Sequence, residues 1–177
     1  MTLEERAAET AANLAQRVSQ VRAKSEPPLV LPMPRGEQKL EYSAMLDAAG
    51  LGLGEGKFLY SVSLPAEPKQ MHDALLQARE QHRAGRAYCR VLKFPQQPTR
   101  VLYVGSSSNL KKRILEHLGF GAQTTYALHL RFWAQGFGDI SINIMRYPAE
   151  IELDLFLFLE DQWARELIPL FGRRGSL

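Results

Sequence analysis

Apolar residues return at regular steps along the chain, and their spacing predicts a succession of helices and strands. In residues 2–24 they recur every three or four positions, which places them on one side of an amphipathic helix (Leu3, Ala7, Ala11, Leu14, Val18, Val21). The prolines within residues 25–36 predict an irregular connector. Alternating apolar and polar residues then predict a strand at 58–64, and an amphipathic pattern predicts a helix at 71–82.

Four glycines precede the first predicted strand, at positions 50, 52, 54 and 56. They do not follow the GxGxxG order after a strand, and no Lys-Ser pair comes after them. We therefore expect a flexible turn here rather than a phosphate-binding loop.

The second half of the chain has a sharper pattern of apolar positions. Strands are predicted at 88–94, 100–104 and 140–144, and helices from about 109 to 119, at 125–135 and at 151–168. A short proline-containing turn separates the first two of these strands, which predicts a hairpin. Ser108 is expected to cap the helix that begins near Asn109.

Composition indicates a globular protein. The 177 residues are 45% hydrophobic and 23% charged. A formal net charge of +3 permits a nucleic-acid partner without indicating one. The single cysteine, Cys89, excludes an intramolecular disulfide and is typical of a reducing compartment. Because Cys89 lies in an apolar run, we expect a small buried side chain rather than a catalytic thiol.

The sequence also bears on membranes and targeting. No stretch approaches 18 apolar residues, so no transmembrane helix and no membrane partner are expected. The first residues include Glu4, Glu5 and Arg6 and lack an apolar signal core, which favours a cytoplasmic location.

Residues 102–113, Leu-Tyr-Val-Gly-Ser-Ser-Ser-Asn-Leu-Lys-Lys-Arg, closely resemble the second motif of the GIY-YIG nucleases. In that superfamily a catalytic arginine follows the motif tyrosine by ten residues, and Arg113 stands ten residues after Tyr103. Several members have a histidine one turn later, where this chain has His117. Glu160 and Pro169 match the metal-binding glutamate and the proline that follow downstream. Where the family has an asparagine, this chain has Gly172.

The first motif of the family is reduced to one tyrosine. Arg86-Ala87-Tyr88 stands in place of Gly-Ile-Tyr, and Tyr88 precedes Tyr103 by fifteen residues. Tyr60, in Phe58-Leu59-Tyr60, is a second candidate. We favour Tyr88, because neighbouring strands are most often joined by short connections.

The resemblance implies a division of the chain and a fold. Residues 86–177 would form the α/β (α+β) nuclease domain, a small antiparallel three-stranded sheet flanked by helices. Residues 1–85 would be an N-terminal, mostly helical extension.

The resemblance also implies an activity, the hydrolysis of phosphodiester bonds in DNA by a divalent-metal-dependent endonuclease. Glu160 would bind Mg²⁺ or Mn²⁺, and Arg113 would bind the phosphate. Tyr88 or Tyr103 would activate or orient the attacking water. His117 is either catalytic or a hydrogen-bonded structural residue. Substrate contacts are expected from Gly105, Ser106, Ser107, Lys111 and Lys112.

Two other interpretations remain open at this stage. A degenerate GIY-YIG domain would bind nucleic acid without cutting it. Alternatively, the N-terminal helix would serve as a protein-interaction module and support self-association. Locally basic residues favour a nucleic-acid partner (Arg100, Lys111, Lys112, Arg113, Arg131, Arg173, Arg174). Spacing within the predicted helix at 125–135 places three aromatic rings on one face (Tyr126, His129, Trp133). We expect these rings to form a core stripe rather than a base-stacking platform.

Overall fold

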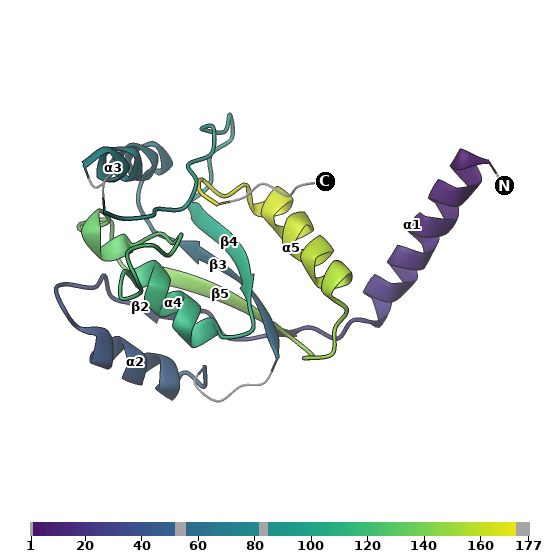
Figure 1. The fold of residues 1–177 in the computed structure, drawn as a ribbon, viewed down its shortest axis with the longest axis horizontal. Helices are drawn as coiled ribbons and strands as arrows, with labels where there is room; N and C mark the ends of the chain where they lie inside the picture. The colour runs from purple at the N-terminus through teal and green to yellow at the C-terminus, as the bar shows by residue number, and fades with distance from the viewer. Residues whose placement is uncertain (1, 52–55, 82–84, 173–177) are drawn as a thin grey trace.

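An antiparallel sheet of five strands runs through the middle of the molecule, and helices lie against both of its faces (Figure 1). The computed structural model describes residues 2–51, 56–81 and 85–172. The strand order is β1-β5-β3-β4, and β2 also pairs with β5. The strands are β1 Lys24–Ser25, β2 Leu29–Leu31, β3 Lys57–Ser63, β4 Val101–Ser107 and β5 Ile140–Tyr147. The helices are α1 Leu3–Gln20, α2 Lys39–Ala48, α3 Pro68–Gln81, α4 Leu110–Leu118 and α5 Leu153–Leu167, with a short 3-10 helix η1 Leu130–Phe132.

The mixed class and the helix-flanked antiparallel sheet are confirmed, but the prediction of three strands is wrong. The sheet also includes β3, which lies between β4 and β5. In addition, the short strands β1 and β2, which lie in or beside the predicted connector, pair with β5. The sheet therefore takes strands from both sides of the predicted boundary at residue 85, and one hydrophobic core continues across it.

The predicted hairpin of residues 88–94 and 100–104 is also wrong. β4 pairs with β3, and residues 88–94 make only isolated bridges, from Tyr88 to Ala127 and from Val91 to Phe171. The physical reason lies in β3, whose residues 58–62 are all buried and fill both faces of the sheet. After β3 the chain leaves the sheet and forms α3, and it returns to the sheet at β4.

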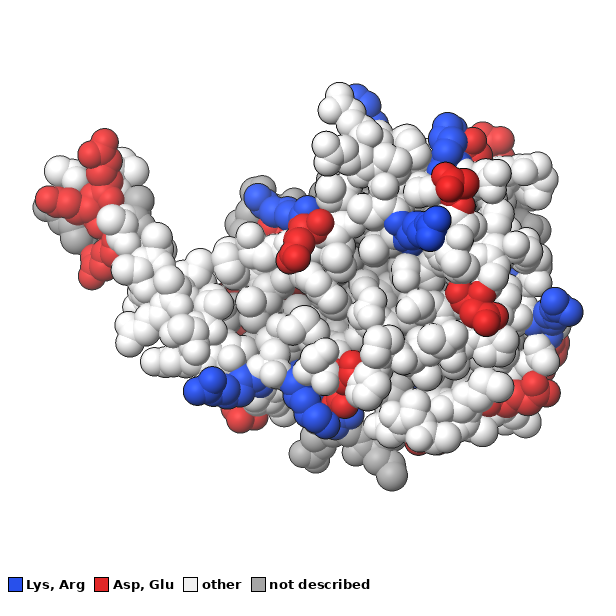
Figure 2. All heavy atoms as spheres, turned by 180° about the vertical axis from the view of Figure 1, so that it is seen from behind, with Lys and Arg blue, Asp and Glu red and all other residues white. Residues whose placement is uncertain are grey.

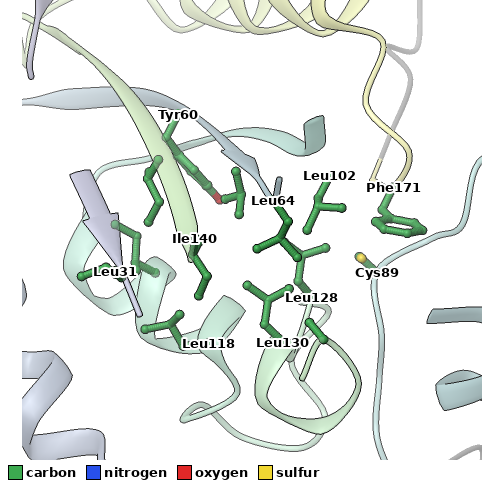
Figure 3. Packing of buried hydrophobic residues seen from close by; sticks show 14 of the residues in the cluster. Leu31, Tyr60, Leu64, Cys89, Leu102, Leu118, Leu128, Leu130, Ile140 and Phe171 are labelled. Carbon is green, nitrogen blue, oxygen red and sulfur yellow. The ribbon is translucent and has the colours of Figure 1, made fainter. Parts of the chain in front are cut away.

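Side chains of β3 alternate between two hydrophobic clusters, as a strand with both faces covered requires. Phe58, Tyr60 and Val62 belong to the larger cluster, which α2, α3 and α4 cover. Figure 3 shows part of this cluster, including Tyr60 and Leu102. Leu59 belongs to the smaller cluster, which α5 and the C-terminal half of α1 cover. Cys89 is buried in the larger cluster, as expected, and burial raises the pKa of its thiol to about 12.

The prediction of a helix at 125–135 is wrong. Only η1 is helical, and His129 before it has a φ of 52°, in the left-handed region. The imidazole Nε2 of His129 contacts the Thr125 carbonyl at 2.9 Å, and the Trp133 indole donates to the Leu128 carbonyl at 2.7 Å. These side chains satisfy carbonyls that a helix would have bonded to backbone N–H groups. His129 is buried, Trp133 is half-buried and Tyr126 is 71% exposed, so the three do not share a core face.

Helix α2 was not predicted, although Tyr42 and Leu46 place it firmly in the core. Gly50 and Gly56 have positive φ angles, in agreement with the expected turn, whereas Gly52 and Gly54 lie outside the described residues. The N-terminal half of α1 projects from the body of the molecule (Figure 1). Within the described part of the chain, none of the helices combines the length and apolar character needed to cross a bilayer.

Candidate active site

Four of the candidate side chains meet beside β4, the edge strand of the sheet. Tyr60 comes from β3, Tyr103 from β4, and Arg113 and His117 from α4. In the β3–β4 ladder Tyr60 lies opposite Gly105 and Val62 opposite Tyr103, so the two tyrosines project from the same face. Arg113 and His117 are four residues apart and therefore point from one side of α4 toward them.

Helix α4 is held in place by its own sequence. The expected cap at Ser108 is wrong: Asn109 caps the helix by accepting a hydrogen bond from the Lys112 backbone N–H at 3.1 Å. Gly119 ends the helix in the left-handed conformation. Leu110, Ile114 and Leu118 are buried against the sheet. The predicted helix is thus confirmed, and its anchored apolar side fixes the direction of its polar residues.

Two glycines make room for the ring of Tyr103. A Cβ atom at Gly105 would collide with that ring and would lie 3.1 Å from the Tyr60 hydroxyl oxygen. Gly172 has a φ of 111°, and a Cβ there would lie 3.1 Å from the other edge of the same ring. An asparagine at position 172, as in the GIY-YIG pattern, would be strained in this backbone conformation and crowded by Tyr103.

The Tyr60 hydroxyl oxygen accepts two hydrogen bonds. His117 Nε2 lies 2.8 Å away, and Arg113 Nε donates at 3.2 Å. His117 Nδ1 accepts from the Leu128 backbone N–H at 3.2 Å, so the imidazole proton must sit on Nε2 and point at Tyr60. With both acceptor positions used, the hydroxyl group of Tyr60 can only donate to a further partner.

Burial sets the charge states of these two groups. It raises the pKa of Tyr60 well above its ordinary value, and the neighbouring Tyr103 adds to the shift while Arg113 opposes it. Burial also lowers the pKa of His117 well below its ordinary value, and the charge of Arg113 acts in the same direction. The site therefore holds a neutral phenol and a neutral imidazole in the free protein. His117 contacts Tyr60 from a fully buried position, which favours the structural interpretation of this histidine.

Arg113 makes four hydrogen bonds within the site. Besides Tyr60, its acceptors are the Tyr103 hydroxyl at 3.3 Å, Glu116 at 2.8 Å and the Tyr126 backbone carbonyl at 3.0 Å. Burial opposes its charge, but the two phenols and Glu116 raise the pKa of Arg113 overall. The guanidinium is therefore always charged and is held by hydrogen bonds to both tyrosine hydroxyls.

Glu160 reaches the same edge strand from α5. Its Oε2 accepts a hydrogen bond from the Ser106 hydroxyl at 2.6 Å, and Ser106 follows Gly105 directly. After burial and Tyr103, the charge of Glu160 also raises the pKa of Tyr60, as expected for a carboxylate close to the phenol. Glu160 thus contacts β4 from the side of α5, at the residue after Gly105, whereas Tyr60, Tyr103 and Arg113 contact one another on the side of α4.

The described residues contain no group of three or more His, Cys, Asp or Glu side chains that could hold a metal ion. Glu160 is half-buried and only one of its oxygens is engaged by Ser106. A single carboxylate of this kind fits Mg²⁺, which keeps several waters and is commonly shared between one or two carboxylates and a phosphate.

Several of the predicted substrate-binding residues contact other residues of the protein. Lys111 forms an ion pair with Asp47 of α2 at 2.7 Å, and the Ser107 hydroxyl accepts from the Asn109 backbone N–H. Lys112 is exposed. Arg131 pairs with Glu37, and Arg173 and Arg174 lie outside the described residues. Figure 2 shows basic and acidic side chains interspersed on the face opposite to that of Figure 1, with acidic side chains crowding the projecting end of α1.

Of the two candidates for the first-motif tyrosine, Tyr60 contacts Arg113. Tyr88 packs its ring against His129, with ring centroids 5.4 Å apart, and its backbone bridges to Ala127. The preference for Tyr88 rested on a short connection between paired strands, and β3 is joined to β4 by a long one. Glu116 was not predicted as a site residue, and Tyr126 was expected in a core stripe. The three-residue spacing of Arg113 and Glu116 on a helix would have indicated their ion pair.

Comparison of the chain with protein families, with curated proteins and with solved structures found no match in any of the three.

Proposed function

We propose that this site belongs to a GIY-YIG-type, divalent-metal-dependent endonuclease that hydrolyses phosphodiester bonds in DNA. The observation that supports the proposal is the contact of two phenols with one guanidinium beside the edge strand β4, together with a carboxylate bound to Ser106 of the same strand. These residues lie far apart along the chain, and their contacts match the chemistry that phosphodiester hydrolysis requires. The resemblance of residues 102–113 to the family motif supports the same assignment.

In the proposed reaction a water oxygen attacks phosphorus and gives one proton to solvent. The bond from phosphorus to the 3′ oxygen breaks, and that oxygen takes up a proton from solvent. Arg113 would neutralise the phosphate oxygens with its permanent charge and with an N–H group that its four hydrogen bonds leave unused. Tyr60 is fully buried and would hold Arg113 in place, and the half-buried Tyr103 would orient the water. A Mg²⁺ or Mn²⁺ ion held by Glu160 would polarise the phosphate and stabilise the departing oxygen. Ser106 would keep Glu160 turned toward the site.

The test is a cleavage assay on plasmid, branched and single-stranded DNA, with and without magnesium. We expect magnesium-dependent cleavage by the wild type and a loss of roughly 100-fold or more in Arg113→Ala and in Glu160→Gln. Arg79→Ala and Glu166→Gln change exposed charges of the same kind on α3 and α5 and should leave the rate unchanged. Absence of cleavage on every DNA and RNA substrate, or cleavage that persists in Glu160→Gln, would argue against the proposal.

A second candidate function is nucleic-acid binding without cleavage, and Gly172 favours it. The family pattern has an asparagine at this place, whereas Gly172 has no side chain and is buried against Tyr103. Binding that weakens with salt and needs no metal, without any cleavage, would support this alternative.

A further inference from the structure

One aromatic ring stands in solvent at the rim of the candidate active site. The Tyr126 side chain is 71% exposed. Among the described residues, the other large apolar side chains of high exposure carry no ring (Leu3, Val30, Leu40, Met45, Leu76, Leu153, Leu157). An exposed tyrosine by itself is ordinary, so its position and the rigidity of its backbone decide whether it has a function.

The backbone around Tyr126 is anchored on both sides. Its own carbonyl accepts the hydrogen bond from Arg113 at 3.0 Å. The preceding carbonyl of Thr125 contacts His129 Nε2, and the following carbonyl of Ala127 accepts from the Cys89 N–H at 2.9 Å. Three consecutive carbonyls are thus bonded to the body of the protein. The ring is presented on a fixed support, which lowers the entropic cost of binding through it.

The anchor also fixes where the ring is presented. Because Arg113 binds the Tyr126 carbonyl directly, the residue that carries the exposed ring lies beside the guanidinium. A base next to a phosphate bound at Arg113 would therefore lie near the residue that carries this ring. A tyrosine can stack only on a base whose face is free, as in single strands, bulges and strand ends.

We propose that Tyr126 stacks on an unpaired nucleobase next to the phosphate bound at Arg113. This inference rests on the proposed function, and it narrows the substrate class to nucleic acids with an unpaired base beside the bond to be cut. Stacking of this kind tolerates any base, so it selects for strand structure rather than for sequence.

Binding in the absence of metal tests the inference without cleavage. The probes are a short fluorescein-labelled single strand, its fully paired duplex, and the same duplex with a single-base bulge. We expect Tyr126→Ala to lose about ten-fold or more in affinity for the single strand and the bulged duplex, and little for the paired duplex. Tyr126→Phe keeps the ring and should bind like the wild type. Leu76→Ala removes an exposed apolar side chain on α3 and serves as the matched control.

A spectroscopic readout complements the affinities. Tyr126→Trp should show fluorescence quenching when the single strand is added, because stacking on a base quenches indole emission. Equal affinities of Tyr126→Ala and the wild type for all three probes, or the same loss on all three, would overturn the inference. The inference would also be overturned if Tyr126→Ala changed only the self-association of the protein, because the ring would then belong to a protein contact.

The outcomes separate this inference from the proposed function. If the wild type cuts no substrate but its binding of the single strand depends on Tyr126, stacking stands and cleavage fails. If the wild type cuts with magnesium and Tyr126→Ala binds and cuts paired and bulged duplexes like the wild type, cleavage stands and stacking fails. Failure of the wild type to bind any of the three probes would overturn the inference as well.

Discussion

The hydroxyl oxygen of Tyr60 joins the two α4 side chains of the site. It accepts from His117 and from Arg113, and removing it would leave both donors without this acceptor. We predict that Tyr60→Phe reduces cleavage by roughly 100-fold or more, since the hydroxyl that holds Arg113 in place is lost. We also expect a loss of about 1–3 kcal/mol in the free energy of unfolding, because buried donors become unsatisfied. Cleavage rates and urea unfolding would measure the two effects separately.

Tyr88→Phe is the matched control for this substitution. It removes the same hydroxyl from the tyrosine that sequence spacing favoured but that packs against His129. We expect activity close to that of the wild type. If Tyr88→Phe were inactive and Tyr60→Phe active, the assignment of the first-motif tyrosine to β3 would be wrong.

At the scale of single residues, the sequence predicted the α4 half of the site better than the β3 half. Tyr103, Arg113 and His117 lie within fifteen residues, where strand and helix periodicities determine which side chains meet. The structure brings all three together. The partner of Tyr103 depends on which distant strand pairs with β4. Both Tyr60 and Tyr88 lie in apolar segments, so local pattern could not decide between them.

At the scale of elements, one glycine of β4 makes room for the ring of Tyr103. Gly105 faces Tyr60 across the ladder, and a Cβ atom there would displace the ring of Tyr103. We predict that Gly105→Ala lowers cleavage by at least about ten-fold while the sheet remains folded, because the displaced ring belongs to the site and not to the centre of the core. Circular dichroism and cleavage rates on the same sample would check this.

Gly85→Ala provides the comparison. Its added Cβ would meet nothing closer than an atom of Gln123 at 3.9 Å, and Gly85 has no positive φ. Equal effects of the two substitutions on activity would show that the close approach at Gly105 has no importance for the site.

Elements were predictable where their periodicity was unambiguous. Helices α1, α3, α4 and α5 and strands β3, β4 and β5 were all predicted at nearly their observed places. Residues 125–135 have helical spacing, yet the side chains of His129 and Trp133 bond to backbone carbonyls and hold an irregular loop. β1 and β2 are two and three residues long, and their pairing with β5 depends on tertiary contacts that local sequence does not encode.

At the scale of the whole molecule, the site lies where two separately packed layers meet. The larger cluster holds α4 on one face, and the smaller cluster holds α5 on the other. Only at an edge strand can side chains from both faces approach one another without passing through the sheet. The first half of this edge is covered by residues 170 and 171, whose N–H groups bond to the carbonyls of Val101 and Leu102. The second half, from Tyr103 to Ser107, carries the site.

The stability of the whole fold should depend on pH through the histidine that supports this site. His117 has a pKa well below its ordinary value of 6.5 because it is buried, so the folded protein keeps it neutral when the unfolded chain would bind a proton. Below about pH 6.5 the unfolded state gains that proton, and stability falls as pH falls, by up to about 1.4 kcal/mol per pH unit from this residue. His129, whose pKa is also lowered by burial, adds to the same trend.

We therefore predict that the free energy of unfolding in urea declines between about pH 7 and pH 5, and that the decline is shallower in His117→Gln by about one proton. Glutamine can still donate to Tyr60 but does not titrate. His129→Gln controls for the second histidine, and parallel slopes in wild type and His117→Gln would contradict the prediction. Protonated His117 could no longer accept from the Leu128 N–H, so the site cannot take up this proton and stay intact. Any loss of activity in acid should therefore follow the unfolded fraction rather than a titration within the folded protein.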